Sequence, residues 1–159
     1  MGAVRDVPVH PEVEPLAFLL GTWSGEGHGE YPNSKPFDYG EEIRVWHVGK
    51  PYLGYASRTW ALDDGRPMHS ELGYWRLKEG RVELAVTHPT GVVEIEDGEL
   101  DGMQVRLATT AVAMTPTAKS VTRLERDLKC TGSLLTYELR MAAVDQPLQY
   151  HLSAQLTRA

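Results

Sequence analysis

The sequence predicts an all-β domain, a ten-stranded antiparallel up-and-down β-barrel with a short N-terminal helix. From Thr22 onward it consists of short runs rich in Val, Ile, Thr, Trp and Tyr, which are typical strand residues. Turn signals such as Pro-Asn, Asp-Asp-Gly and Thr-Gly separate these runs at hairpin spacing, which makes about ten strands. Consecutive antiparallel strands lose their exposed edges most simply by closing, and a barrel of this size leaves room for a cavity.

The only helical pattern lies before these strands. In residues 11–20, apolar side chains recur at near-helical spacing, and Gly21 is placed to end the helix. We expect this helix to be a plug or lid at one end of the barrel. We assign residues 1–15 to an N-terminal extension and residues 16–159 to the barrel domain.

Two hairpins can be placed individually. Strand-like residues 74–77 and 81–86 are separated by Lys-Glu-Gly, which predicts a tight turn between them. In the same way, Asp97 and Gly98 are expected to form a turn that ends a strand over residues 91–96. The order of the strands is therefore that of a meander.

Composition limits the classes of function. With 159 residues and 42% hydrophobic content, the chain is long enough for one domain. A formal charge of −6 with no basic stripe argues against nucleic acid or an anionic membrane as partner. The single cysteine, Cys130, excludes an intramolecular disulfide and fits a reducing, cytoplasmic location. We expect neither export nor membrane insertion, because the N-terminus lacks a signal pattern and no run of eighteen apolar residues occurs.

Residues 21–27 form a glycine-rich segment around a tryptophan, with the sequence GTWSGEG. It is not a phosphate-binding loop, because a nucleotide cradle follows a strand and precedes a helix, whereas here the order is reversed. We expect Gly21, Gly25 and Gly27 to let the first strand bend, and Trp23 to pack across the barrel floor.

The histidines show no zinc-site spacing. They are His10, His28, His47, His69, His88 and His151. Most are expected at the surface, including His88 in a turn. His151 differs because it follows a break imposed by Pro147 and opens the last strand. It is either a half-buried histidine hydrogen-bonded at the barrel rim or a ligand facing the cavity. Strand alternation groups it with the side of Ser153, so an inward His151 requires a twist or bulge.

Nucleophilic and acid–base chemistry find little support. Cys130 has Lys129 beside it, but one basic neighbour is weak ground for a catalytic thiolate. No catalytic triad is visible. The acidic pairs are expected at turns or on a solvated outer face. These pairs are Asp63-Asp64, Glu41-Glu42 and Glu94-x-Glu96.

The segments LGTWSGEG at residues 20–27, GEYP at residues 29–32 and QPLQYHL at residues 146–152 resemble the nitrobindins. These are haem-binding barrels similar to fatty-acid-binding proteins. The resemblance implies a ten-stranded barrel with b-type haem near its mouth and His151 as the axial ligand of the iron. It implies isomerisation of peroxynitrite to nitrate at ferric haem, reversible binding of nitric oxide and a mainly apolar distal side. By the same match Lys119 would contact the haem, through a propionate.

Two other classes stay open. The barrel is alternatively a non-catalytic carrier or sensor for haem, nitric oxide or a fatty acid. A lipid carrier needs inward arginines, and four arginines lie on strands where some could face in: Arg76, Arg106, Arg123 and Arg140. The third class is an interaction domain with a filled interior, in which His151 is merely hydrogen-bonded. The sequence does not fix the oligomeric state, and a homodimer stays open.

Overall fold

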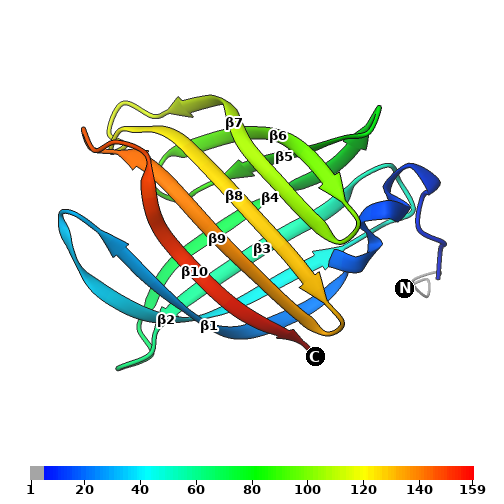
Figure 1. Ribbon diagram of the computed structural model, residues 1–159, viewed down its shortest axis with the longest axis horizontal. Helices are drawn as coiled ribbons and strands as arrows, with labels where there is room; N and C mark the ends of the chain where they lie inside the picture. Colours follow the sequence, from blue (N-terminus) through cyan, green and yellow to red (C-terminus); the bar gives the residue numbers. More distant parts are fainter. Residues whose placement is uncertain (1–5) are drawn as a thin grey trace, which may run out of the picture.

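The computed structural model describes residues 6–159 and shows a closed ten-stranded antiparallel barrel with one short helix, η1, at one end (Figure 1). The helix spans Pro11–Leu19. The strands are β1 (Gly21–Tyr31), β2 (Ser34–Trp46), β3 (Leu53–Ala61), β4 (Pro67–Lys78), β5 (Arg81–Thr87), β6 (Val92–Asp101), β7 (Gln104–Met114), β8 (Val121–Thr131), β9 (Leu134–Ala143) and β10 (Gln149–Arg158). Each strand pairs with the next in sequence, and β1 with β10 closes the barrel. The fold class predicted from the sequence is confirmed.

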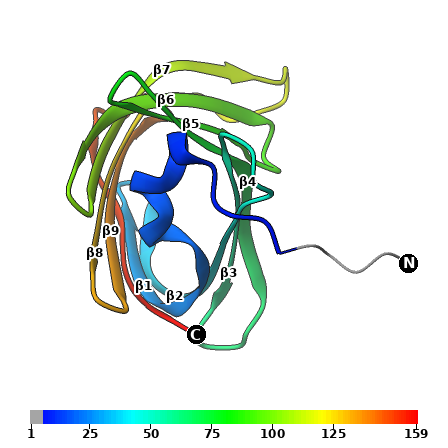
Figure 2. The same cartoon turned by 90° about the vertical axis from the view of Figure 1, so that its right-hand side faces the viewer.

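Helix η1 is the plug that the sequence predicts. Its buried side chains are Val13, Leu16 and Leu19, and Figure 2 shows the helix lying across the barrel end. It is a 3₁₀-helix that contains Pro15, which has no backbone N–H to donate. The helix ends before extended Leu20, so Gly21 does not cap it.

Trp23 forms the floor of the barrel above the plug. Its side chain is fully buried, and its Nε1 donates to the carbonyl oxygen of Leu19 at 2.9 Å. The guanidinium of Arg158, on the last strand, lies 4.4 Å from the centroid of the Trp23 ring, on the first strand. This contact helps to join the two strands that close the barrel. The floor role expected of Trp23 is confirmed.

Gly25 is required by the close approach of β10. A Cβ at this position would lie 2.0 Å from the carbonyl oxygen of Gln155, which is backbone and cannot move aside cheaply. We predict that Gly25→Ala destabilises the barrel by about 1–3 kcal/mol, because the two strands must separate locally. Thermal unfolding measures the effect, with the exposed neighbour Ser24→Ala as control. A melting temperature equal to that of the control would contradict this account.

One predicted hairpin is correct and the other is misplaced. The β4–β5 turn lies at Glu79 and Gly80, both with positive φ, as two-residue hairpins require. The turn predicted at Asp97 and Gly98 is wrong, because both residues lie inside β6. The chain turns instead at residues 102–103. Gly98 is a glycine because a Cβ there would lie 1.7 Å from a backbone oxygen of β7.

We call the end of the barrel opposite η1 the mouth (Figure 1). Strands β7 and β8 pair only between Gln104–Ala108 and Glu125–Lys129, so their mouth-side halves separate (Figure 1). The loop of residues 115–120 joins these two halves. A side-chain hydrogen bond still bridges the two strands there, from the backbone N–H of Leu124 to Oγ1 of Thr109 at 3.2 Å.

Within residues 6–159, the only helix is too short to span a bilayer. The division at residue 15 stays a prediction, and η1 extends across it.

Candidate functional site

The barrel encloses one elongated cavity of about 330 Å³ that reaches from the floor to the mouth. This volume lies at the lower end of the range for small-molecule sites, roughly 300–1,000 Å³. Leu19 lines it at the floor, and His151 and Leu152 line it at the mouth. A filled interior, which an interaction domain would show, is not observed.

His151 is turned into the cavity by a β-bulge. Strand β10 pairs with β9 through Tyr150 opposite Arg140 and through Leu152 opposite Leu139, so the register shifts at His151. The extra residue reverses the alternation and places the imidazole among the cavity-lining side chains. An inward His151 required such an irregularity, and the structure contains it.

The hydrogen bonding of the imidazole leaves one ring nitrogen available. Nδ1 of His151 lies 3.0 Å from the carbonyl oxygen of Glu30, and since a carbonyl only accepts, Nδ1 carries the proton. Among residues 6–159 no hydrogen bond reaches Nε2. Burial lowers the pKa of His151, which favours the neutral form at neutral pH. A neutral imidazole held through Nδ1–H is the arrangement typical of metal-ligating histidines.

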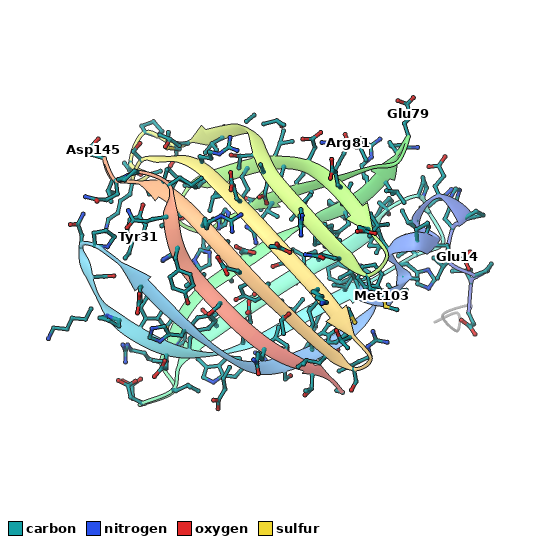
Figure 3. The ribbon with its side chains drawn as sticks, viewed as in Figure 1. Glu14, Tyr31, Glu79, Arg81, Met103 and Asp145 are labelled. Atoms are coloured by element: carbon teal, nitrogen blue, oxygen red, sulfur yellow. The ribbon has the colours of Figure 1, made fainter. Side chains whose placement is uncertain are left out.

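Two aromatic side chains hold the His151 ring in place. Tyr31 packs edge-on at 5.2 Å between ring centroids, and Phe37 does so at 6.5 Å. The hydroxyl of Tyr31 accepts from the backbone N–H of Ala143 at 2.8 Å and donates to the carbonyl oxygen of Met141 at 3.2 Å. Figure 3 shows Tyr31 at the mouth end, far from Glu14 on η1. These contacts restrict the ring to one orientation before any ligand binds.

Lys119 lies in the loop between β7 and β8, at the same end of the barrel as His151. Its side chain is exposed and does not line the cavity. The ammonium group is therefore free to contact an anionic group at the mouth, although no direct contact with His151 exists.

The wall opposite His151 carries two histidines, and the sequence predicts one of them, His88, in an exposed turn. His69 on β4 and His88 after β5 both line the cavity, and the side chain of His88 is only 9% exposed. His69 Nε2 lies 3.0 Å from His88 Nδ1. The expectation of a surface position is wrong for His88. In the strand order, β5 lies directly across the barrel from β10, and β4 lies next to β5.

A buried charge cluster lies deeper in the cavity, around Arg126 on β8. Its Nε donates to Glu96 at 2.7 Å, its Nη1 and Nη2 donate to the two oxygens of Glu71 at 3.3 and 3.2 Å, and Nη2 also contacts Glu94. Glu94 and Glu96 are fully buried. Tyr55 donates its hydroxyl proton to Glu71 at 2.7 Å.

The expected outer-face position of Glu94 and Glu96 is therefore wrong. In β6 Glu94 and Glu96 face inward, while Val93 and Ile95 are 44% and 48% exposed. Arg126 explains the reversal, because it supplies a buried counter-charge that offsets the cost of removing these carboxyls from water. Asp63 and Asp64 are exposed at a turn, as expected.

Glu41, also expected outside, is buried in a second polar network. Ser57 donates to it at 2.5 Å and the Tyr137 hydroxyl at 2.6 Å, and Tyr137 in turn contacts the Tyr39 hydroxyl at 2.6 Å. Burial raises the pKa of Glu41 to about 7, against these hydrogen bonds. Glu42, its sequence neighbour, faces outward toward Arg44 and Arg58.

Proton occupancy differs between the two buried glutamates of β6. Burial raises the pKa of Glu96 to about 8, against the nearby Arg126. Burial also acts on Glu94, but there the attraction of Arg126 prevails and lowers its pKa to about 2. At neutral pH, Glu94 is therefore ionised and Glu96 holds a proton.

We predict that the free energy of unfolding falls as the pH rises from about 5 to about 8. Glu96 keeps its proton to about pH 8 when folded but releases it near its ordinary value of 4.5 when unfolded. The folded state then binds more protons, so stability decreases with pH. Glu96→Gln should flatten this dependence in urea titrations, whereas the exposed control Glu99→Gln should not. Equal slopes in both variants would contradict the assignment.

The four strand arginines considered for a lipid carboxylate face outward. Arg76, Arg106, Arg123 and Arg140 have exposed side chains in surface ion pairs. The inward arginine is Arg126, which the sequence reasoning missed, and three carboxyls already surround it. The interior therefore offers a fatty-acid carboxylate no free cation among residues 6–159, which disfavours the lipid-carrier hypothesis.

Comparisons with known proteins agree with this architecture. Residues 12–158 match the family model described as the THAP4-like, heme-binding beta-barrel domain. The chain is 51% identical to a protein named peroxynitrite isomerase 2 from Mycobacterium marinum, covering 94% of this chain and 96% of that one. It is 48% identical to the peroxynitrite isomerase of Nocardia farcinica, covering 96% and 94%. The crystal structure of Rv2717c from M. tuberculosis superposes with a TM-score of 0.90 at 44% identity, covering 96% and 99%. The chain therefore belongs to the family of THAP4-like haem-binding β-barrel domains, the nitrobindin family.

Proposed function

We propose that this protein binds b-type haem through Nε2 of His151 and isomerises peroxynitrite to nitrate. The observation that carries the proposal is the bulged His151, whose Nδ1–H is held by Glu30 and whose Nε2 is left without a partner inside the cavity. Relatives about half identical in sequence are named for this reaction, which supports the same activity here.

The side chains around His151 suit a flat apolar macrocycle. Phe37, Met141 and Leu152 line the mouth half of the cavity. Lys119 lies exposed at the rim of the mouth. Its positively charged ammonium group would form an ion pair with a negatively charged haem propionate. Within residues 6–159 the Nδ1 of His151 faces the backbone carbonyl of Glu30 and not a carboxylate, so the imidazole donates less electron density than in sites where a carboxylate accepts that proton.

The reaction needs no partner for electrons or protons, because peroxynitrite and nitrate contain the same atoms and carry the same charge. Bound haem supplies a ferric iron, a Lewis acid for an oxygen of the substrate. The protein would confine the substrate, because mainly apolar side chains line the mouth half of the cavity around it. His69 also lines this cavity and would be one candidate to hydrogen-bond an anionic substrate.

The activity is tested by mixing haemin-loaded protein with peroxynitrite in a stopped-flow instrument and measuring nitrate and nitrite afterwards. We expect the decay rate to rise in proportion to the concentration of haem-loaded protein, with nitrate as the main product. The haem-free chain is the control and should not accelerate the decay. A decay rate independent of haem loading would exclude the proposed catalysis.

The same open coordination position would bind nitric oxide reversibly, and we retain that as part of the proposal. Nitric oxide added to the ferrous haem-loaded protein should shift the Soret band, and removal of the gas should restore it. We place the protein in the cytoplasm, which its single cysteine favours.

A homodimer through the outer face of β4–β7 is also part of the proposal. Registers across these strands align Leu72 with Val93 and Tyr74 with Ile95, and all four side chains are at least 44% exposed. A contiguous apolar face of this kind commonly marks an interface, and a two-fold axis would place it against itself. Sedimentation of wild type and of Ile95→Glu tests this, and a monomeric wild type would exclude it.

A further inference from the structure

Three potential metal ligands converge on the wall of the cavity that faces His151. His69 Nε2 and His88 Nδ1 are 3.0 Å apart, and Glu71 Oε1 lies 4.0 Å from the first and 3.7 Å from the second. A point equidistant from these three atoms lies about 2.1 Å from each, which is the length of Zn–N and Zn–O bonds. Ligand atoms of a tetrahedral zinc site lie about 3.4 Å apart, so these three separations would have to change by about 0.3–0.6 Å.

The side chains that contact His88 and Glu71 are arranged as the groups that orient metal ligands are in known sites. His88 Nε2 points to Glu94 Oε2 at 3.4 Å, and both atoms are buried without a hydrogen bond. If Nδ1 of His88 binds a cation, its proton moves to Nε2 and faces Glu94, which gives the histidine–carboxylate pair common behind metal ligands. Glu71 is oriented by the hydroxyl of Tyr55 and by Arg126.

The local charge also favours a cation. Glu96 holds a proton at neutral pH, but the carboxylates of Glu71 and Glu94 both face the single guanidinium of Arg126, so the ionised acidic groups still outnumber it. The side chain of His69 is 38% exposed, and the cavity opens at the mouth, which provides an entry path. The site is thus pre-formed and accessible.

We propose that His69, Glu71 and His88 bind one first-row divalent cation of the zinc type, at a site separate from the haem ligand His151. Two imidazoles and one carboxylate are the ligand set of zinc and of non-haem iron(II) centres. Three protein ligands leave a coordination position for water or a small anion, and the site lines the same cavity as His151.

Titration with Co²⁺ alone tests the site, because its visible d–d bands report coordination geometry. The experiment uses the His151→Ala chain, which removes both the haem absorption and the only other cavity histidine among residues 6–159. We expect the bands to saturate at one Co²⁺ per chain and to vanish when Zn²⁺ is added. Calorimetry with Zn²⁺ on the haem-loaded wild type should give the same stoichiometry.

Substitutions then locate the cation. His69→Ala and His88→Ala should abolish the bands, and Glu94→Gln should weaken binding by about 10- to 100-fold through His88. The matched control is His28→Ala, since His28 contacts Asp38 and Glu30 on the outer surface. Circular dichroism checks that each variant is folded. Bands that survive both histidine substitutions, that are lost with His28→Ala, or that never saturate would overturn the proposal.

Discussion

Replacing Arg126 with methionine is expected to lower the free energy of unfolding by about 3–5 kcal/mol, the typical cost of breaking a buried ion pair by removing one partner. The substitution keeps most of the side-chain volume but leaves Glu71, Glu94 and Glu96 without their shared cation. Buried carboxyls would then have to remain ionised in an apolar interior or take up protons. Urea denaturation at neutral pH measures the loss.

The loss of unfolding free energy caused by Arg126→Met should become smaller as the pH falls. Protonated carboxyls no longer need the guanidinium, so the difference from wild type should shrink as the pH falls toward about 4. Adding Glu94→Gln to Arg126→Met should recover part of the stability at neutral pH. Arg140→Met is the control, because its ion pairs with Glu125 and Glu138 lie at the surface and contribute little. A deficit no larger than that of the control would show that the cluster does not stabilise the barrel.

Replacing His151 with glycine is expected to abolish haem-dependent decay of peroxynitrite while leaving the barrel folded. The imidazole is half-buried and makes a single hydrogen bond, to the carbonyl of Glu30, so the free energy of unfolding should change by only about 1 kcal/mol. Stopped-flow decay with haemin and the variant should match haemin alone. Near-ultraviolet circular dichroism verifies the fold.

Chemical rescue separates an axial-ligand role of His151 from a structural one. Glycine leaves a gap where free imidazole can bind between Tyr31 and Phe37, whose rings flank His151 in the wild type. Added imidazole should therefore restore haem binding and part of the activity of His151→Gly. Haem retention by the glycine variant without imidazole would assign the iron to another residue.

Much of the fold follows from local patterns in the sequence. The strand number, the β4–β5 turn at Glu79-Gly80 and the plug helix depend on turn chemistry and apolar spacing within a few residues. The need for a bulge at His151 could be derived from strand alternation alone, and β10 contains that bulge.

Which polar side chains face the interior of the barrel could not be predicted from local patterns. Alternating glutamates with Val93 and Ile95 usually place the acids outside, and the inward orientation depends on Arg126, thirty positions beyond Glu96. A local pattern does not show which distant strand supplies a counter-charge. Gly98 was a usable signal for the inward face of β6. It lies on the same face as Glu94 and Glu96, and its backbone approaches β7 too closely for a side chain.

The histidine pair was missed for a related reason. His69 and His88 are nineteen positions apart, with no metal-site spacing. The antiparallel register brings them together, because Leu72 on β4 pairs with Thr87 on β5 and carries the two flanking histidines to one wall. The hairpin of β4 and β5 was placed from the sequence, but the residues that pair across it were not assigned, so the proximity of the two histidines was not predicted.

The central claim is that Nε2 of His151 holds the haem iron, and an absorption titration with haemin tests it most directly. Wild type and His151→Ala are titrated side by side. Our account predicts a Soret band that saturates at one haemin per wild-type chain and does not form with the folded variant. The same saturating Soret band in both proteins, or in neither, would contradict it.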